Sequence, residues 1–176
     1  LVAHKDPKYG DAMVLPTALG PMHKGHTAYL KRRWFDPSQL AEQWGVQGVG
    51  LTADKWANRI FIPITVEGRL VNFMGRAINS RQSPPYTTPP PAQALMNHKD
   101  SLYGWDQAEG DTVVAVEGVL DVWRLGPGAV GTYGTGWTTA QLNLLATKKH
   151  RIVMFDCEPE AQVAGRALAK ALSAYP

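Results

Sequence analysis

The second half of the chain alternates between short, β-branched apolar runs and amphipathic segments. The apolar runs have the length of buried strands, and the amphipathic segments repeat their apolar positions with the period of a helix. The expected strands cover residues 112–116, 129–133 and 151–155, and the expected helices cover residues 119–125, 138–147 and 160–173. The last helix places Ala161, Ala164, Leu168 and Leu172 on one face. This alternation predicts a parallel sheet with right-handed crossovers.

The first half of the chain has a different pattern, typical of an α+β lobe. We expect helices over residues 27–33 and 36–44, strands over residues 59–64 and 69–77, and an ordered, extended proline-rich crossover over residues 83–91. Asp36 is a suitable cap for the second helix, and Pro63 indicates an edge or irregular strand position. Residues 1–20 are expected to be a poorly structured lead-in. The predicted fold class is α/β, a parallel sheet flanked by helices and preceded by a smaller α+β lobe.

The charges are unevenly distributed along a chain of 176 residues, of which 44% are hydrophobic and whose formal net charge is +3. Basic residues crowd an early stretch and acidic residues a later one, namely Lys24, Lys31, Arg32 and Arg33, then Asp100, Asp106, Glu109, Asp111, Glu117 and Asp121. This arrangement favours a polyanion held near a metal site. Solvated helix faces explain the basic cluster equally well.

The single cysteine, Cys157, excludes an internal disulfide and leaves no cysteine-based zinc site. We expect it to be a small buried filler rather than a nucleophile. No window of the sequence is long and apolar enough to cross a membrane, and there is no signal-peptide pattern. We therefore expect a cytoplasmic protein without a membrane partner.

Two acidic pairs follow the apolar runs 112–116 and 151–155. Glu117 and Asp121 are four residues apart, while Asp156 and Glu158 are two apart and point to the same side of an extended chain. Ligands of open α/β sheets bind at the carboxyl ends of the strands, so we expect the four carboxylates to share one small volume. Their repulsion raises pKa values and is relieved by a divalent cation such as Mg²⁺ or Mn²⁺. The alternative is exposed strand-end acids without a shared role.

These acidic segments resemble motifs of TOPRIM domains. Residues 116–121, Val-Glu-Gly-Val-Leu-Asp, resemble the glutamate motif, and residues 155–158, Phe-Asp-Cys-Glu, resemble the paired-aspartate motif with Glu158 in place of the second aspartate. Residues 131–136 lie where these domains carry a strand end of small residues. The resemblance implies catalytic roles for Glu117, Asp121, Asp156 and Glu158, with Glu117, Asp156 and Glu158 as ligands of Mg²⁺ or Mn²⁺.

The upstream half resembles bacterial DnaG-type primases, with its segments in the same order as in that family. The matching segments are residues 27–45, 59–77, 85–88 and 97–104. The resemblance covers about residues 25–172, and phage primases and primase-helicases are the most similar. It implies an N-terminal primase-core lobe over residues 1–108 and a TOPRIM domain over residues 109–176, truncated at its C-terminal end. Neither a zinc-binding module nor the last strand of a TOPRIM sheet is expected within the chain.

The resemblance implies the catalytic core of a DNA primase. Such an enzyme synthesises short RNA primers from ribonucleoside triphosphates on a single-stranded DNA template, in a bacterial cell or a phage-infected host. A replicative helicase, fused or separate, is the expected partner. Two alternatives stay open. One is a TOPRIM-type nuclease that uses the same carboxylates to cleave phosphodiesters, and the other is a non-catalytic DNA-binding module of a primase-helicase.

Basic residues of the first half are expected to contact nucleotides and DNA. Arg76 and Lys99 match family residues that hold nucleotide phosphates or the template. The cluster Lys31, Arg32 and Arg33 could grip single-stranded DNA, with Tyr29 and Trp34 available for stacking. A place for Trp34 in the core is the favoured interpretation.

Overall fold

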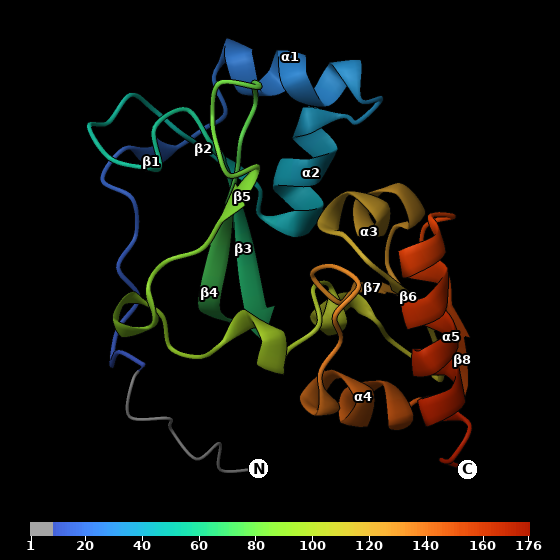
Figure 1. The fold of residues 1–176 in the computed structure, drawn as a ribbon. Helices are drawn as coiled ribbons and strands as arrows, with labels where there is room; N and C mark the ends of the chain where they lie inside the picture. Colours follow the sequence, from blue (N-terminus) through green and yellow to red (C-terminus); the bar gives the residue numbers. More distant parts are fainter. Residues whose placement is uncertain (1–8) are drawn as a thin grey trace. The chain divides into compact units, whose positions relative to one another are not determined.

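The computed structural model describes residues 9–176, and the first part of the expected lead-in, residues 1–8, lies outside the described residues (Figure 1). The chain forms two compact units. The first runs to Ile64 and includes Leu70–Met96, and the second comprises Thr65–Arg69 and Asn97–Pro176. The two units are similar in size.

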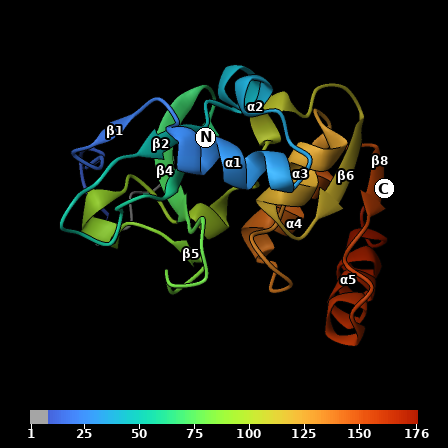
Figure 2. The ribbon, with the colours of Figure 1, turned by 90° about the horizontal axis from the view of Figure 1, so that it is seen from above.

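The N-terminal unit contains a five-stranded sheet and two helices, α1 and α2, which pack against each other (Figure 2). The pairs β1–β2, β2–β3 and β4–β5 are antiparallel. The elements are β1 (Leu19–Gly20), α1 (Lys24–Arg32), α2 (Pro37–Trp44), β2 (Gln47–Val49), β3 (Ile60–Val66), β4 (Arg69–Arg76), β5 (Tyr86–Thr87) and the 3₁₀ turn η1 (Pro91–Gln93). The helices and the strand pair expected from the sequence are all present.

Local sequence explains where the two helices begin and end. Asp36 caps α2, because its carboxylate accepts hydrogen bonds from the backbone N–H groups of Ser38 and Gln39, and Gly45 ends the helix in a left-handed conformation with φ +64°. Helix α1 begins earlier than residue 27, because the side chain of His23 accepts a hydrogen bond from the N–H of Gly25 and so acts as its cap.

Aromatic packing fixes the core of the N-terminal sheet. The ring of Phe73 lies 4.7 Å from that of Trp56 and 4.9 Å from that of Phe61, measured between centroids. Pro63 lies in β3 beyond Phe61, the last residue that pairs with β2 in the observed register. Since proline cannot donate to a ladder, this place agrees with the irregular position expected for it.

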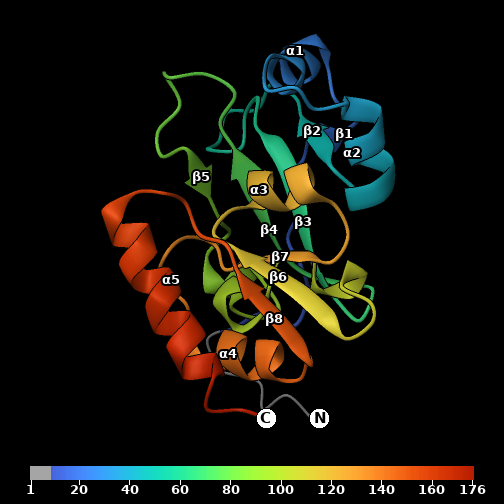
Figure 3. The same cartoon turned by 90° about the vertical axis from the view of Figure 1, so that its right-hand side faces the viewer.

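The C-terminal unit contains a three-stranded parallel sheet in the order β7-β6-β8 (Figure 3). Its elements are the 3₁₀ turns η2 (His98–Asp100) and η3 (Trp105–Gln107), then β6 (Thr112–Val116), α3 (Val119–Leu125), β7 (Ala129–Gly131), α4 (Thr139–Ala146), β8 (His150–Val153) and α5 (Pro159–Leu172). The predicted α/β class, with a parallel sheet flanked by helices, is confirmed.

Helices cover this sheet through two apolar contacts. Val113 and Ala115 of β6 join Leu145 of α4 and Leu168 of α5 in one buried cluster. Helix α3 packs against β7, and a Cβ added at Gly131 would lie 3.3 Å from the side chain of Val122. The small residue at the end of β7 thus allows the close approach of α3.

Residues 97–108 group with the C-terminal unit rather than with the N-terminal one. Leu102 and Ala108 belong to its buried cluster, and Tyr103 exchanges backbone hydrogen bonds with Gly131. The roles assigned to residues 1–108 and 109–176 stay predictions.

The expected burial of Cys157 is wrong, because this residue is exposed. In the part of the chain that the structure describes, no helix has the length and apolar character of a membrane span.

Candidate active site

The ends of two neighbouring parallel strands bring acidic residues to one edge of the sheet. Strands β6 and β8 pair in register as far as Ala115 and Val153. Glu117 follows β6 directly, and Asp156 follows β8 after Met154 and Phe155. The carboxylate of Glu117 accepts a hydrogen bond of 2.8 Å from the backbone N–H of Asp156. The two acidic turns predicted from the sequence are therefore in direct contact.

The acids of this edge lie within each other's electrostatic field. Burial, and then repulsion by Asp156, Asp121 and Glu158, raise the pKa of Glu117, against the opposing effect of the Asp156 N–H. Burial and repulsion by Asp156 likewise raise the pKa of Asp121. A carboxylate whose charge is destabilised in this way gains from a nearby cation.

Asp121 also has a structural role at the start of α3. Its carboxylate accepts a hydrogen bond of 3.1 Å from the N–H of Gly118, the residue that caps the helix. A Cβ at Gly118 would lie only 2.9 Å from this carboxylate, so a residue with a side chain would disturb the contact. The structure gives Asp121 a capping function, whereas Asp156 and Glu158 are exposed.

The donor set at this edge fits a divalent cation through its chemistry, because hard carboxylate oxygens that repel one another suit Mg²⁺ or Mn²⁺. Among residues 9–176, however, no group of three His, Cys, Asp or Glu side chains is arranged to hold a metal ion by itself. Mg²⁺ is commonly held by one or two carboxylates together with substrate phosphates and water. Glu117 and Asp156 are the best-placed pair for this, and a third ligand from Glu158 stays a prediction.

A glutamine that the sequence analysis missed holds the segment after β8. The side-chain amide of Gln162, in α5, donates to the backbone carbonyls of Asp156, at 2.8 Å, and Phe155, at 3.2 Å. Phe155 is buried beside Gly165 of the same helix. Gln162 and the buried Phe155 thus hold the backbone of Asp156 in place. A single glutamine in a helix is too weak a sequence signal to predict this.

Lys99 belongs to η2, and its side chain reaches the loop that follows β7. Its ammonium group donates to the carbonyls of Thr132 and Tyr133, both at 3.0 Å, and of Gly136 at 2.7 Å. Burial lowers its pKa. The N–H of Gly134 in turn donates to the carbonyl of Glu117. Lys99 therefore organises the loop beside the catalytic candidate, and direct contact with nucleotide phosphates stays a prediction.

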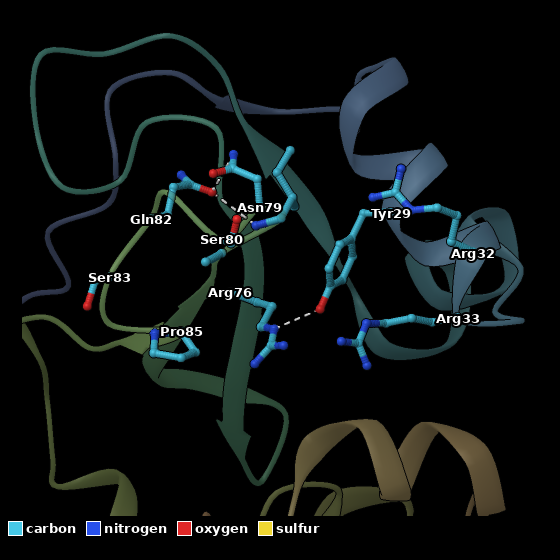
Figure 4. A pocket seen from close by; sticks show the side chains of 11 residues that line it. Tyr29, Arg32, Arg33, Arg76, Asn79, Ser80, Gln82, Ser83 and Pro85 are labelled. Carbon is cyan, nitrogen blue, oxygen red and sulfur yellow. Dashed lines mark hydrogen bonds between the residues drawn. The ribbon is translucent and has the colours of Figure 1, made fainter.

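The N-terminal unit contains a basic hollow of about 740 Å³ (Figure 4). Arg76 donates to the hydroxyl of Tyr29 at 2.9 Å, and its guanidinium lies 4.5 Å from the ring centre of Tyr86. Arg33 lies over the ring of Tyr29, 5.1 Å from its centre. Arg32 lines the same hollow. The predicted DNA-binding residues Arg32 and Arg33 thus line the same hollow as Arg76. Lys31 lines a different hollow of the same unit.

Solved structures share this fold. The zinc-binding and RNA polymerase domains of the Aquifex aeolicus primase match with a TM-score of 0.73 and 23% identity, over 85% of this chain and 47% of that one. A structure of the DnaG catalytic core matches with a TM-score of 0.71 and 20% identity, over 86% of this chain and 61% of that one. The described fold is that of the catalytic core of DnaG-type primases, as the motif resemblance implied.

Sequence comparison adds a more particular relationship. The chain is 35% identical over 135 residues to a DNA primase of Legionella pneumophila. The match covers 70% of this chain and 23% of that primase, so the chain spans less than a quarter of that relative. No family model matches the chain. The chain is thus related in sequence to a DNA primase, and the assignment of its C-terminal unit as a TOPRIM domain stays a prediction.

Proposed function

We propose that this chain is the catalytic core of a DNA primase, which synthesises short RNA primers from ribonucleoside triphosphates on single-stranded DNA. The fold and the sequence relationship support this proposal. The observation that carries it is the hydrogen bond between the carboxylate of Glu117 and the backbone N–H of Asp156. It joins two acidic turns whose residues are 39 positions apart in sequence. The contact brings the two acidic turns together, as a shared metal site requires.

In the proposed reaction, Glu117 acts as metal ligand or general base, and Asp156 as metal ligand. A bound Mg²⁺ would neutralise charge on the nucleotide phosphates and orient the attacking oxygen. The arginines of the N-terminal hollow, Arg33 and Arg76, would hold phosphate oxygens, because a guanidinium matches these oxygens with two parallel hydrogen bonds. The RNA polymerase domain of the Mycobacterium tuberculosis primase DnaG was solved in complex with double-stranded DNA. It matches this chain with 26% identity and a TM-score of 0.51, over 86% of this chain and 53% of that one. That complex supports a nucleic acid as ligand, and a replicative helicase stays a predicted partner.

The test is template-directed incorporation of labelled ribonucleotides in the presence of Mg²⁺. We expect Asp156→Asn to lower incorporation by at least about a hundredfold, because it removes the carboxylate charge that is proposed to bind Mg²⁺. Glu160→Gln is the matched control, because Glu160 is also acidic and exposed at the start of α5 but has no predicted role. Undiminished incorporation by a folded Asp156→Asn protein would contradict the proposal.

The same assay separates the alternatives. A nuclease would shorten a labelled single strand in the presence of Mg²⁺ instead of extending a primer, and Asp156→Asn would stop this cleavage. A non-catalytic module would bind the strand in a salt-sensitive manner without changing its length.

A further inference from the structure

Trp34 occupies an unfavourable conformation on the surface of the N-terminal unit. It follows α1, and its backbone is left-handed with φ +62°. Its N–H donates to the carbonyl of Lys31, and the N–H of the next residue, Phe35, donates to that of Leu30. Helices commonly end in this way, but with glycine at the left-handed position, because a side chain there is strained.

The side chain of Trp34 gains little from burial, since it is 88% exposed. The neighbouring Phe35 is only 8% exposed and belongs to the core. The favoured interpretation of Trp34 as a core residue is therefore wrong. A large aromatic residue that is both strained and exposed does not serve the fold, which suggests that it serves a ligand.

The surroundings of Trp34 indicate the chemistry of that ligand. Trp34 and Lys31 line a hollow of about 630 Å³. Among residues 9–176, Asp36 is the only acid in its lining, and its carboxylate accepts hydrogen bonds from the backbone of α2. The sequence of α1 contains no acidic residue, and its last turn is basic. A positive helix that ends in an exposed indole suits a polyanion with free aromatic faces.

We propose that Trp34 stacks on an unpaired base of a single-stranded nucleic acid, and that Lys31 contacts the adjacent backbone phosphates. The bases of a duplex are already stacked on each other, so the surface favours a single strand. This proposal rests on the proposed function only in identifying the strand as the primase template. It does not depend on any role of Glu117 or Asp156.

The test measures affinity of the whole chain for a fluorescently labelled oligo(dT) by anisotropy, at low salt and without Mg²⁺ or nucleotides. Trp34→Gly should weaken binding about tenfold, which is the order expected for one lost stacking contact. Its melting temperature should stay unchanged or rise, because glycine suits φ +62°. Trp34→Asn should behave alike, since asparagine tolerates the left-handed region. Trp34→Tyr should retain most of the affinity.

Leu51→Ala is the matched control, because Leu51 is another large apolar residue of the same unit and is 84% exposed. The affinity of this variant for oligo(dT) should equal that of the wild type. Wild-type affinity of both Trp34→Gly and Trp34→Asn would overturn the proposal. Equal weakening of binding to a blunt-ended DNA duplex would overturn it as well. Priming is measured separately. A chain that binds through Trp34 but makes no primers refutes the proposed function alone, and a priming chain indifferent to Trp34 refutes this inference alone.

Discussion

Among single residues, Lys99 binds the protein's own backbone, while its predicted contact with nucleotide phosphates stays a prediction. All three hydrogen bonds of its ammonium group go to carbonyls of the loop that follows β7. We expect Lys99→Met to lower the free energy of unfolding by about 1–3 kcal/mol, because it leaves these carbonyls without their donor. Chemical denaturation checks this, with Lys149→Met as the exposed control. Equal stability of the two variants would contradict the structural role.

His26 makes stability depend on pH. It is fully buried, and burial, followed by repulsion from His23, lowers its pKa to about 4 from the ordinary value of 6.5. As pH falls from 6.5 to 4, the unfolded chain binds a proton that the folded chain does not, so the folded state loses stability. Denaturation curves at several pH values should show this loss, of at most about 1.4 kcal/mol per pH unit. A His26→Gln protein with the same dependence would contradict the assignment.

The sequence predicted the contact between the two acidic turns better than it predicted burial. The acidic pairs were found because each closes an apolar run, and Glu117 and Asp156 do meet. Trp34 and Cys157 were expected inside because of their residue types, yet both are exposed. Their places depend on the conformation of the backbone on either side. That conformation is fixed by tertiary packing, which no local pattern records.

Among the elements, α2 is a helix whose two ends can be predicted from the sequence. Asp36, Pro37 and Gly45 mark its cap, first turn and end, and the structure agrees. We expect Asp36→Ala to lower the free energy of unfolding by about 1 kcal/mol, because two backbone N–H groups lose their acceptor. Thermal unfolding checks this, with Glu42→Ala on the same helix as control. An equal effect of both changes would contradict the capping role.

Other elements were predicted in kind but not in extent. Strands β7 and β8 end before residues 133 and 155, because the chain turns away to form the loops that carry the site. Tyr133 is left-handed with φ +60°, which a β-branched or aromatic residue rarely adopts, so the sequence favoured strand there. The start of α1 was missed since histidine is an uncommon cap.

For the whole molecule, the charges are divided between the two units. The described residues of the N-terminal unit contain eight Lys and Arg against four Asp and Glu, and the C-terminal unit contains eight against ten. The sequence showed this asymmetry directly, because it needs no knowledge of the fold. This division is what the proposed function requires, with phosphates held by the N-terminal unit and a metal ion by the C-terminal one. The sequence could not show which acids touch, since that depends on the register of β6 and β8.

The central claim is that Glu117 and Asp156 share a divalent cation when a nucleotide is bound. The most direct measurement is an anomalous difference map from crystals of this chain soaked in Mn²⁺ and a ribonucleoside triphosphate. The account predicts a peak bonded to carboxylate oxygens of both residues, and no such peak in crystals of Asp156→Asn. A map with Mn²⁺ bound only elsewhere, or with these carboxylates turned away from the ion, would contradict it.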